Sequence, residues 1–140
     1  MDKRSFIKKF LGISVAGTLA SIIYPVSRYL IPPKREESEA QSVIAGKVDD
    51  FLPNSGQIIK FGNKPALLVR TERGEFRAFI AICTHLDCTV QFRDNKQDIW
   101  CACHNGIYDL YGKNVSGPPP KPLTPLVVNV RGDKVVVSRT

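Results

Sequence analysis

Hydrophobic residues follow two different patterns along this chain. Near the N-terminus an apolar stretch runs from Phe10 to Val26 without a charged residue, and it continues to Ile31 if Arg28 extends its charge to the membrane surface. At ~1.5 Å per residue in a helix, the longer stretch is sufficient to cross the ~30 Å hydrocarbon core of a bilayer. The pattern therefore predicts one transmembrane helix within residues 1–31.

The apolar stretch is preceded by four basic residues, Lys3, Arg4, Lys8 and Lys9. This layout is typical of an export signal or a signal anchor. The string from Lys3 to Lys8 resembles the twin-arginine export motif, with Lys in place of the first Arg. No Ala-x-Ala cleavage site follows the apolar stretch, so we expect an uncleaved anchor rather than a cleaved signal peptide. Because basic flanks stay in the cytoplasm, the rest of the chain is expected on the periplasmic side.

Residues 32–42 differ from both neighbouring segments. They begin with Pro32 and Pro33 and continue with charged and polar residues. The segment has no apolar face to bury, so it predicts a flexible tether.

From Val43 onward, short apolar runs alternate with turn residues. The runs that predict strands are Val43–Val48, Gln57–Phe61, Pro65–Thr71, Phe76–Ile82, Asp98–Cys101, Leu126–Val130 and Lys134–Ser138. Hairpin turns are predicted between pairs of these runs, at Gly62-Asn63, Arg73-Gly74 and Arg131-Gly132-Asp133. We find no convincing 3.6-residue period here, so residues 43–140 predict an all-β domain, a small antiparallel sandwich or barrel.

Composition agrees with one globular domain and narrows the range of partners. The chain has 140 residues, of which 43% are hydrophobic and 24% charged, which excludes a fully disordered or polytopic membrane protein. Its formal net charge is +7. Residues 1–40 hold seven Lys or Arg against four acidic residues, and the remainder holds thirteen against nine, without a basic run. Such scattered charge is typical of a solvated surface, so we expect no nucleic-acid partner.

The residues able to bind a metal are concentrated in two short boxes. All four Cys and both His lie within residues 83–88, Cys-Thr-His-Leu-Asp-Cys, and residues 101–106, Cys-Ala-Cys-His-Asn-Gly. Four of these six side chains could close a tetrahedral zinc site. Alternatively, two Cys and two His could bind a [2Fe–2S] cluster, with the two remaining Cys joined as a disulfide. The residues alone leave both alternatives open.

The two boxes resemble those of Rieske iron–sulfur proteins, of the type found in cytochrome bc1 and b6f complexes. The family pattern is Cys-Thr-His-Leu-Gly-Cys followed by Cys-Pro-Cys-His-Gly-Ser, so this chain departs from it at Asp87, Ala102, Asn105 and Gly106. Downstream, Ile107-Tyr108-Asp109 is similar to the family's aromatic-Asp continuation. The sequence Gly117-Pro118-Pro119-Pro120 resembles the family's proline loop. The resemblance covers residues 60–140 and also the plan of anchor, tether and head.

This resemblance implies a ligand set and a covalent link between the boxes. Cys83 and Cys101 would bind one iron of a single Rieske-type [2Fe–2S] cluster, and His85 and His104 the other. Cys88 and Cys103 would form a disulfide. Rieske ferredoxins and ring-hydroxylating oxygenases lack this extra Cys pair. A disulfide persists outside the cytosol, which agrees with the predicted export.

The resemblance also implies roles for residues around the cluster. His104 would hydrogen-bond quinol and accept its proton, and Leu86 would contact the quinol pocket at the tip of the head. Tyr108 would place its hydroxyl against a cysteine sulfur and tune the cluster. Residues Gly117 to Pro120 would shield the cluster.

We therefore expect the iron–sulfur subunit of a membrane quinol:cytochrome c oxidoreductase. It would take one electron from quinol bound to cytochrome b and pass it to a c-type cytochrome, with no catalysis outside the complex. An alternative from the same resemblance is the small Rieske subunit of a periplasmic molybdenum oxidase such as arsenite oxidase. A third hypothesis is an exported zinc-binding module without a redox role.

One departure from the family pattern bears on the reduction potential. The second box of the family has a Ser whose hydroxyl donates to a bridging sulfide, and here that position is Gly106. A charge-assisted hydrogen bond of ~1.5–3 kcal/mol corresponds, for one electron, to a potential lower by on the order of 100 mV when it is lost. A low potential favours menaquinol as the donor, unless the Asn105 amide replaces the missing hydroxyl.

Overall fold

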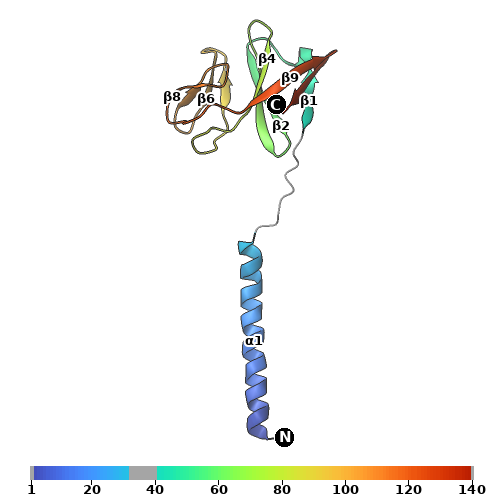
Figure 1. The fold of residues 1–140 in the computed structure, drawn as a ribbon, viewed down its shortest axis with the longest axis vertical. Coiled ribbons are helices and arrows are strands. Elements are labelled where there is room, and N and C mark those ends of the chain that lie inside the picture. Colours follow the sequence, from blue (N-terminus) through green and yellow to red (C-terminus); the bar gives the residue numbers. More distant parts are fainter. Residues whose placement is uncertain (1, 32–40, 140) are drawn as a thin grey trace. The chain divides into compact units, whose positions relative to one another are not determined.

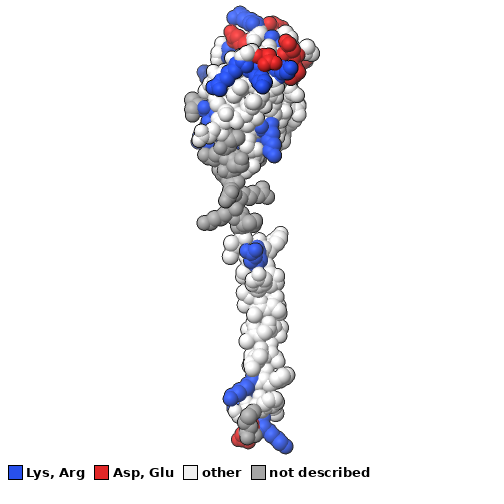
Figure 2. All heavy atoms as spheres, turned by 90° about the vertical axis from the view of Figure 1, so that its right-hand side faces the viewer, with Lys and Arg blue, Asp and Glu red and all other residues white. Residues whose placement is uncertain are grey.

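The structure is a computed structural model that describes residues 2–31 and 41–139. The first of these parts consists of helix α1, Lys3–Leu30, which has no buried residue within the described segment. Its charged side chains lie near its two ends, and none lies between Lys9 and Arg28 (Figure 2). With 28 residues at ~1.5 Å each, the helix is long and apolar enough to cross a membrane, as predicted. The predicted tether falls largely on residues 32–40, outside the described residues.

The β-rich head occupies the second described part (Figure 1). Within residues 41–139, one antiparallel sheet of six strands has the order β1-β10-β9-β4-β3-β2, and we call it the large sheet. Its strands are β1 Ser42–Lys47, β2 Ser55–Phe61, β3 Lys64–Arg70, β4 Phe76–Ile80, β9 Pro125–Arg131 and β10 Lys134–Ser138, with the short 3-10 helix Val48–Asp50 after β1. All the strands predicted from the sequence are present, and the sheet curls into the near-barrel of the predicted all-β class.

Two of the predicted hairpin turns contain a glycine at a position where the backbone has a positive φ. Gly62 joins β2 to β3 with φ of 59°, and Gly132 joins β9 to β10 with φ of 62°. A positive φ is readily adopted by glycine and allows the two-residue turns that match the twist of the strands.

A second sheet, the small sheet, has the order β5-β6-β7-β8 within the described residues. Its strands are β5 Gln91–Arg93, β6 Asp98–Cys101, β7 Gly106–Tyr108 and β8 Asn114–Ser116. Only β6 was predicted from the sequence. The other three strands have three residues each, too few to show an alternating pattern.

Strand β3 separates two hydrophobic cores. Leu67 and Val69 point to one side and pack with residues of the small sheet, whereas Ala66 and Leu68 point to the other side and pack inside the large sheet. Successive side chains of a strand face opposite sides, so a continuous apolar run fills both cores. The small sheet therefore packs against one face of β3, and the other face of β3 contributes to the core of the large sheet.

Candidate metal centre

The first box forms a loop that leaves the large sheet after β4. An isolated antiparallel bridge between Ile82 and Thr89 closes the base of this loop. Inside it, the amide of Cys83 donates to the carbonyl of Cys88 at 2.8 Å, and the amide of Asp87 donates to the carbonyl of Cys83 at 3.1 Å. These bonds make the six residues of the box one compact turn.

The second box is the loop of the hairpin formed by β6 and β7. Cys101 ends β6 and pairs with Gly106, the first residue of β7. The fifth residue of each box has a left-handed backbone, with φ of 58° at Asp87 and 57° at Asn105. The family pattern quoted above has glycine at both positions. Asp and Asn are the residues that tolerate this conformation best after glycine, which explains how both departures fit the fold.

A disulfide joins the two loops. It links Cys88 to Cys103 with a Cα–Cα distance of 6.6 Å, as the sequence resemblance implied. The Sγ atom of Cys101 lies within 4.8 Å of both sulfurs of this disulfide. Because the disulfide consumes two of the four thiols, Cys83 and Cys101 are the cysteines left to bind a metal.

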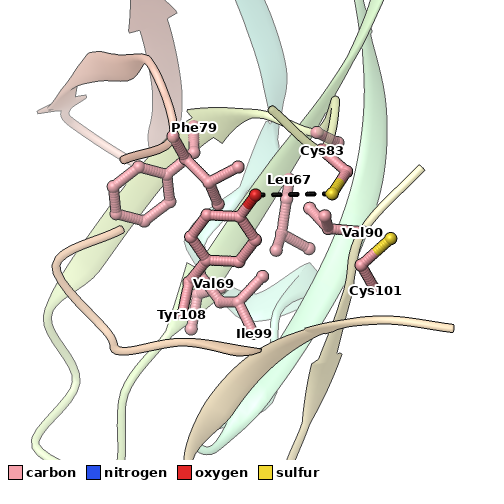
Figure 3. Close-up of a cluster of buried hydrophobic side chains, with 10 residues drawn as sticks. Leu67, Val69, Phe79, Cys83, Val90, Ile99, Cys101 and Tyr108 are labelled. Carbon is pink, nitrogen blue, oxygen red and sulfur yellow. Dashed lines mark hydrogen bonds between the residues drawn. The ribbon is translucent and has the colours of Figure 1, made fainter. Parts of the chain in front are cut away.

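These two thiols lie at the edge of the core on the small-sheet side of β3 (Figure 3). Cys83 is 2% exposed and Cys101 is 1% exposed. They are surrounded by buried apolar side chains, among them Leu67, Val90 and Ile99. Burial in such surroundings keeps water away from any group bound to the two sulfurs.

The two histidines face each other across the boxes. The ring centroids of His85 and His104 are 4.7 Å apart, and the ring planes are nearly perpendicular at 86°. His85 is half-buried, and its Nδ1 atom is buried without a hydrogen-bond partner among the described residues. A buried nitrogen in this state is unfavourable unless it binds something, and a neutral imidazole nitrogen is a common metal ligand. His104, in contrast, is exposed.

The hydroxyl of Tyr108 lies 3.4 Å from the Sγ atom of Cys83, as the dashed line in Figure 3 shows. The amide of Thr84 donates to this hydroxyl at 3.1 Å, and the Oγ1 atom of Thr84 lies 3.2 Å from it. The hydroxyl of Thr84 donates its own proton to the carbonyl of Lys121 at 2.7 Å. The single proton of the Tyr108 hydroxyl is therefore available to Cys83 Sγ or to Thr84 Oγ1, and a thiolate is the stronger acceptor.

The same contacts change the acidity of these groups. Burial raises the pKa of the Cys83 thiol, but hydrogen bonds from Tyr108 and from the backbone of His85 outweigh it, so the net pKa lies below its usual value. Burial also raises the pKa of Cys101 and that of Tyr108. Cys83 is therefore the more acidic of the two free thiols, and Tyr108 stays protonated as a hydrogen-bond donor.

The predicted proline loop packs against the second box. Gly117 has φ of 87°, and a Cβ atom placed on it would lie 2.8 Å from the carbonyl oxygen of Asn105. A Cβ atom on the buried Gly106 would lie 2.6 Å from Cγ of Pro119. Pro119 is itself buried, and its carbonyl accepts a hydrogen bond from the side chain of Asn114 at 3.0 Å. The loop leaves no room for a larger residue at position 106.

Thr84 and Asn114 support the site although no sequence pattern considered above assigned them a role. Thr84 belongs to the first box as written in the family pattern, so its position in the motif was a usable signal. Asn114 contacts the carbonyl of Pro119, five positions further along the chain, and no local pattern predicts that bond. Leu86, predicted at the tip, is 64% exposed.

Comparison with known proteins agrees with this geometry. Residues 41–139, which include both boxes, the disulfide and the proline loop, match the family described as the Rieske [2Fe-2S] domain. The chain belongs to the Rieske [2Fe–2S] family. Its cofactor is therefore a Rieske-type [2Fe–2S] cluster, which decides against the zinc module left open by the residues alone. Two buried free thiols and an unpartnered buried imidazole nitrogen fit that cluster.

Among curated Rieske relatives, the chain is similar to two cytochrome b6-f complex iron-sulfur subunits. It is 35% identical over 137 residues to that of Chlorobaculum tepidum, covering 98% of this chain and 75% of the relative. It is 33% identical over 138 residues to that of Chlorobaculum thiosulfatiphilum, covering 99% and 76%.

A solved structure described as a hyperthermophilic respiratory Complex III has a chain with the same fold. It superposes with a TM-score of 0.57 at 24% identity and covers 89% of this chain and 97% of its own. The Rieske fold and electron transfer by an iron–sulfur cluster are thus established for the family to which this protein belongs.

Proposed function

We propose that this Rieske protein is the iron–sulfur subunit of a membrane quinol:cytochrome c oxidoreductase. It takes one electron from quinol at a cytochrome b subunit and delivers it to a c-type cytochrome. The similarity to cytochrome b6-f subunits supports this proposal because it extends over 98–99% of the chain and so includes α1 as well as the head. The relatives named above are subunits of cytochrome b6-f complexes, which favours this function over that of a small subunit of a periplasmic molybdenum oxidase.

In this proposal the cluster ligands are Cys83 and Cys101 on one iron and His85 and His104 on the other. The cluster supplies reversible one-electron chemistry when it is bound. Cys83 and Cys101 hold its buried side, and the disulfide between Cys88 and Cys103 keeps the two loops from separating.

One observation carries the assignment of quinol as the donor. The centre is buried on its thiol side, where Cys83 and Cys101 are at most 2% exposed, and open on its imidazole side, where His104 is exposed. An exposed imidazole is able to accept a hydroxyl proton at a ring nitrogen while the electron leaves the quinol. Leu86, exposed on the neighbouring loop, offers an apolar contact to the quinol ring.

The second box supports menaquinol rather than ubiquinol as the donor. Gly106 cannot donate a hydrogen bond, and Pro119 occupies the space that a side chain there would need. The Asn105 amide is oriented toward Trp100, whose indole donates to its Oδ1 atom at 2.8 Å, and this bond leaves the Nδ2 donors unused. Tyr108 remains as the hydroxyl donor near a cysteine sulfur, so we expect a low-potential centre.

We further propose that α1 is an uncleaved anchor, with the twin-arginine-like string at its start, and that the head lies on the periplasmic side. The length and composition of α1 and the disulfide support this arrangement, because a disulfide persists outside the reducing cytosol.

Affinity purification of the full-length chain from detergent-solubilised membranes tests the proposal. We expect co-purification of a b-type cytochrome and a c-type cytochrome, quinol:cytochrome c reductase activity, and an intact N-terminus by mass spectrometry. Co-purification of a molybdopterin subunit without cytochrome b would overturn it in favour of the oxidase alternative. A mature N-terminus near residues 25–45 would overturn the anchor.

A further inference from the structure

A hydrogen bond between two side chains crosses the second box. The indole Nε1–H of Trp100 donates to Oδ1 of Asn105 at 2.8 Å. Trp100 lies on β6 just before Cys101, and Asn105 is the loop residue just before β7. The bond therefore spans the mouth of the loop, and His104 lies between the two ends that it connects.

The Trp100 ring is itself held in place from β5. The guanidinium of Arg93 lies over this ring, 5.2 Å from its centroid. Arg93 forms two hydrogen bonds to the Asp98 carboxylate, at 2.7 and 2.6 Å, and both side chains are largely buried. A bidentate pair of this kind fixes the plane of the guanidinium, and so it fixes the face on which the indole stacks.

On the other side of Asn105 the chain is fixed by packing. Gly106 lies under Pro119, and Gly117 approaches the carbonyl oxygen of Asn105 so closely that a Cβ atom there would be 2.8 Å away. Asn105 has a left-handed backbone, which is uncommon for any residue but glycine. Its side-chain bond to Trp100 stabilises that conformation against the extended one.

We propose that Trp100 and Asn105 are positioning residues that hold the His104 imidazole in the orientation in which it meets quinol. This inference rests on the proposed function in taking His104 as the quinol contact. The bond acts through the backbone: it restrains residue 105, and residue 105 restrains the adjacent His104. Without it, the loop moves more freely, and the imidazole tilts about its bond to the cluster, so that its free ring nitrogen is directed less well toward the substrate.

The variant Trp100→Phe tests this inference because it keeps the aromatic ring under Arg93 and removes only the N–H donor. In the full-length protein carrying its cluster, we expect amide hydrogen exchange of residues 102–106 to become about 2- to 10-fold faster, the size expected for one neutral hydrogen bond. In the complex, we expect kcat/KM for quinol per cluster to fall by about the same factor. Cluster content should stay unchanged, and the thermal midpoint should fall by no more than about 8 °C, as the loss of one neutral hydrogen bond implies.

Two further variants serve as matched tests: one changes Asn105, the hydrogen-bond partner of Trp100, and the other changes Tyr111, an aromatic residue outside the two boxes. Asn105→Gly accepts the left-handed backbone but has no acceptor, so it should show the same two effects, and Trp100→Phe should add nothing to it. If Trp100→Phe fails to fold, Asn105→Gly alone tests the inference. Tyr111 is another aromatic residue with an arginine over its ring, since Cζ of Arg77 lies 3.9 Å from the ring centroid, and it lies outside the two boxes. Tyr111→Phe should therefore change neither the hydrogen exchange of residues 102–106 nor kcat/KM for quinol.

The outcomes separate the inference from the function on which it rests. Unchanged exchange together with unchanged quinol kinetics would overturn the positioning role alone. Faster exchange with an unchanged kcat/KM for quinol would show that the bond restrains the loop without orienting His104, and would also overturn the positioning role. Absence of quinol oxidation by the unmodified complex would instead overturn the proposed function. Effects of Trp100→Phe that persist fully in the Asn105→Gly background would overturn the hydrogen bond as their cause.

Discussion

The large sheet and the small sheet belong to one head but are stabilised by different means. Strands of the large sheet have five to seven residues and enclose a core of apolar side chains such as Phe51, Leu68 and Val135. Strands of the small sheet have three or four residues, and the core beneath them includes two cysteines and the buried Tyr108. Strands this short are rarely stable without additional links. A disulfide and side-chain hydrogen bonds supply such links here.

The difference shows how this fold separates stability from chemistry. The large sheet relies on strand pairing and hydrophobic burial, which tolerate sequence change as long as the pattern is kept. The small sheet holds its loops by a few specific bonds, each of which also affects a metal ligand or its neighbour. Changes in the small sheet should therefore alter the cluster before they alter the fold, and changes in the large sheet should do the reverse.

The largest expected effect comes from removing a proposed ligand. Cys83→Ala or His85→Ala should abolish the cluster, seen as complete loss of its visible absorption and of the EPR signal of the reduced state. The far-UV circular dichroism of the large sheet should persist, because its core lies on the other face of β3. Retention of full iron content in either variant would contradict the ligand assignment.

A smaller effect is expected from the disulfide. The double variant Cys88→Ser/Cys103→Ser opens a link across 15 residues, which should lower the free energy of unfolding of the small sheet by about 3 kcal/mol. The cluster should still assemble but should be lost at a lower temperature, measured as bleaching of visible absorption on heating.

The matched control for the disulfide variant is Leu68→Ala in the core of the large sheet. It should lower the free energy of global unfolding by about 2–5 kcal/mol without changing the visible or EPR spectrum of the folded protein. A spectrum altered by Leu68→Ala, or a disulfide variant as heat-stable as the unmodified protein, would contradict the separation between the two sheets.

Tyr108→Phe removes the hydroxyl near Cys83 Sγ and leaves the buried ring. A hydrogen bond to a cluster ligand stabilises the more negative, reduced state, so its loss should lower the midpoint potential by on the order of 100 mV. Protein-film voltammetry measures this shift. Tyr111→Phe is the control, with no expected shift, and a potential unchanged in Tyr108→Phe would exclude the hydroxyl as a tuning group.

The smallest effect is expected at Gly106, where the structure changes the experiment suggested by the sequence. Gly106→Ser alone must displace Pro119, so it should perturb the loop. Combined with Pro119→Ala, the Ser hydroxyl has room to donate, and the potential should rise by up to about 100 mV relative to Pro119→Ala alone. A potential that stays constant or falls would rule out the missing hydroxyl as a cause of low potential.

The local motifs of this protein are evident from its sequence. Each of the two boxes is a continuous run of six residues, so the resemblance to the Rieske family implied both the cluster and the disulfide between Cys88 and Cys103. Both are confirmed. The ligand set, the role of Leu86 and the choice of menaquinol stay predictions. The strands of the large sheet were predicted because five to seven residues suffice to show an apolar run and its flanking turns.

The sequence by itself thus determined the apolar helix, the strands of the large sheet, the turn glycines and the cluster-binding boxes, since each depends on residues close together in the chain. Only the tertiary structure decided which face of β3 serves which core, where the three-residue strands pair, why Gly106 lies under Pro119 and how Trp100 meets Asn105. These features depend on side chains that meet only after the loops have folded together. Their energies come from packing and hydrogen-bond geometry that no local pattern encodes.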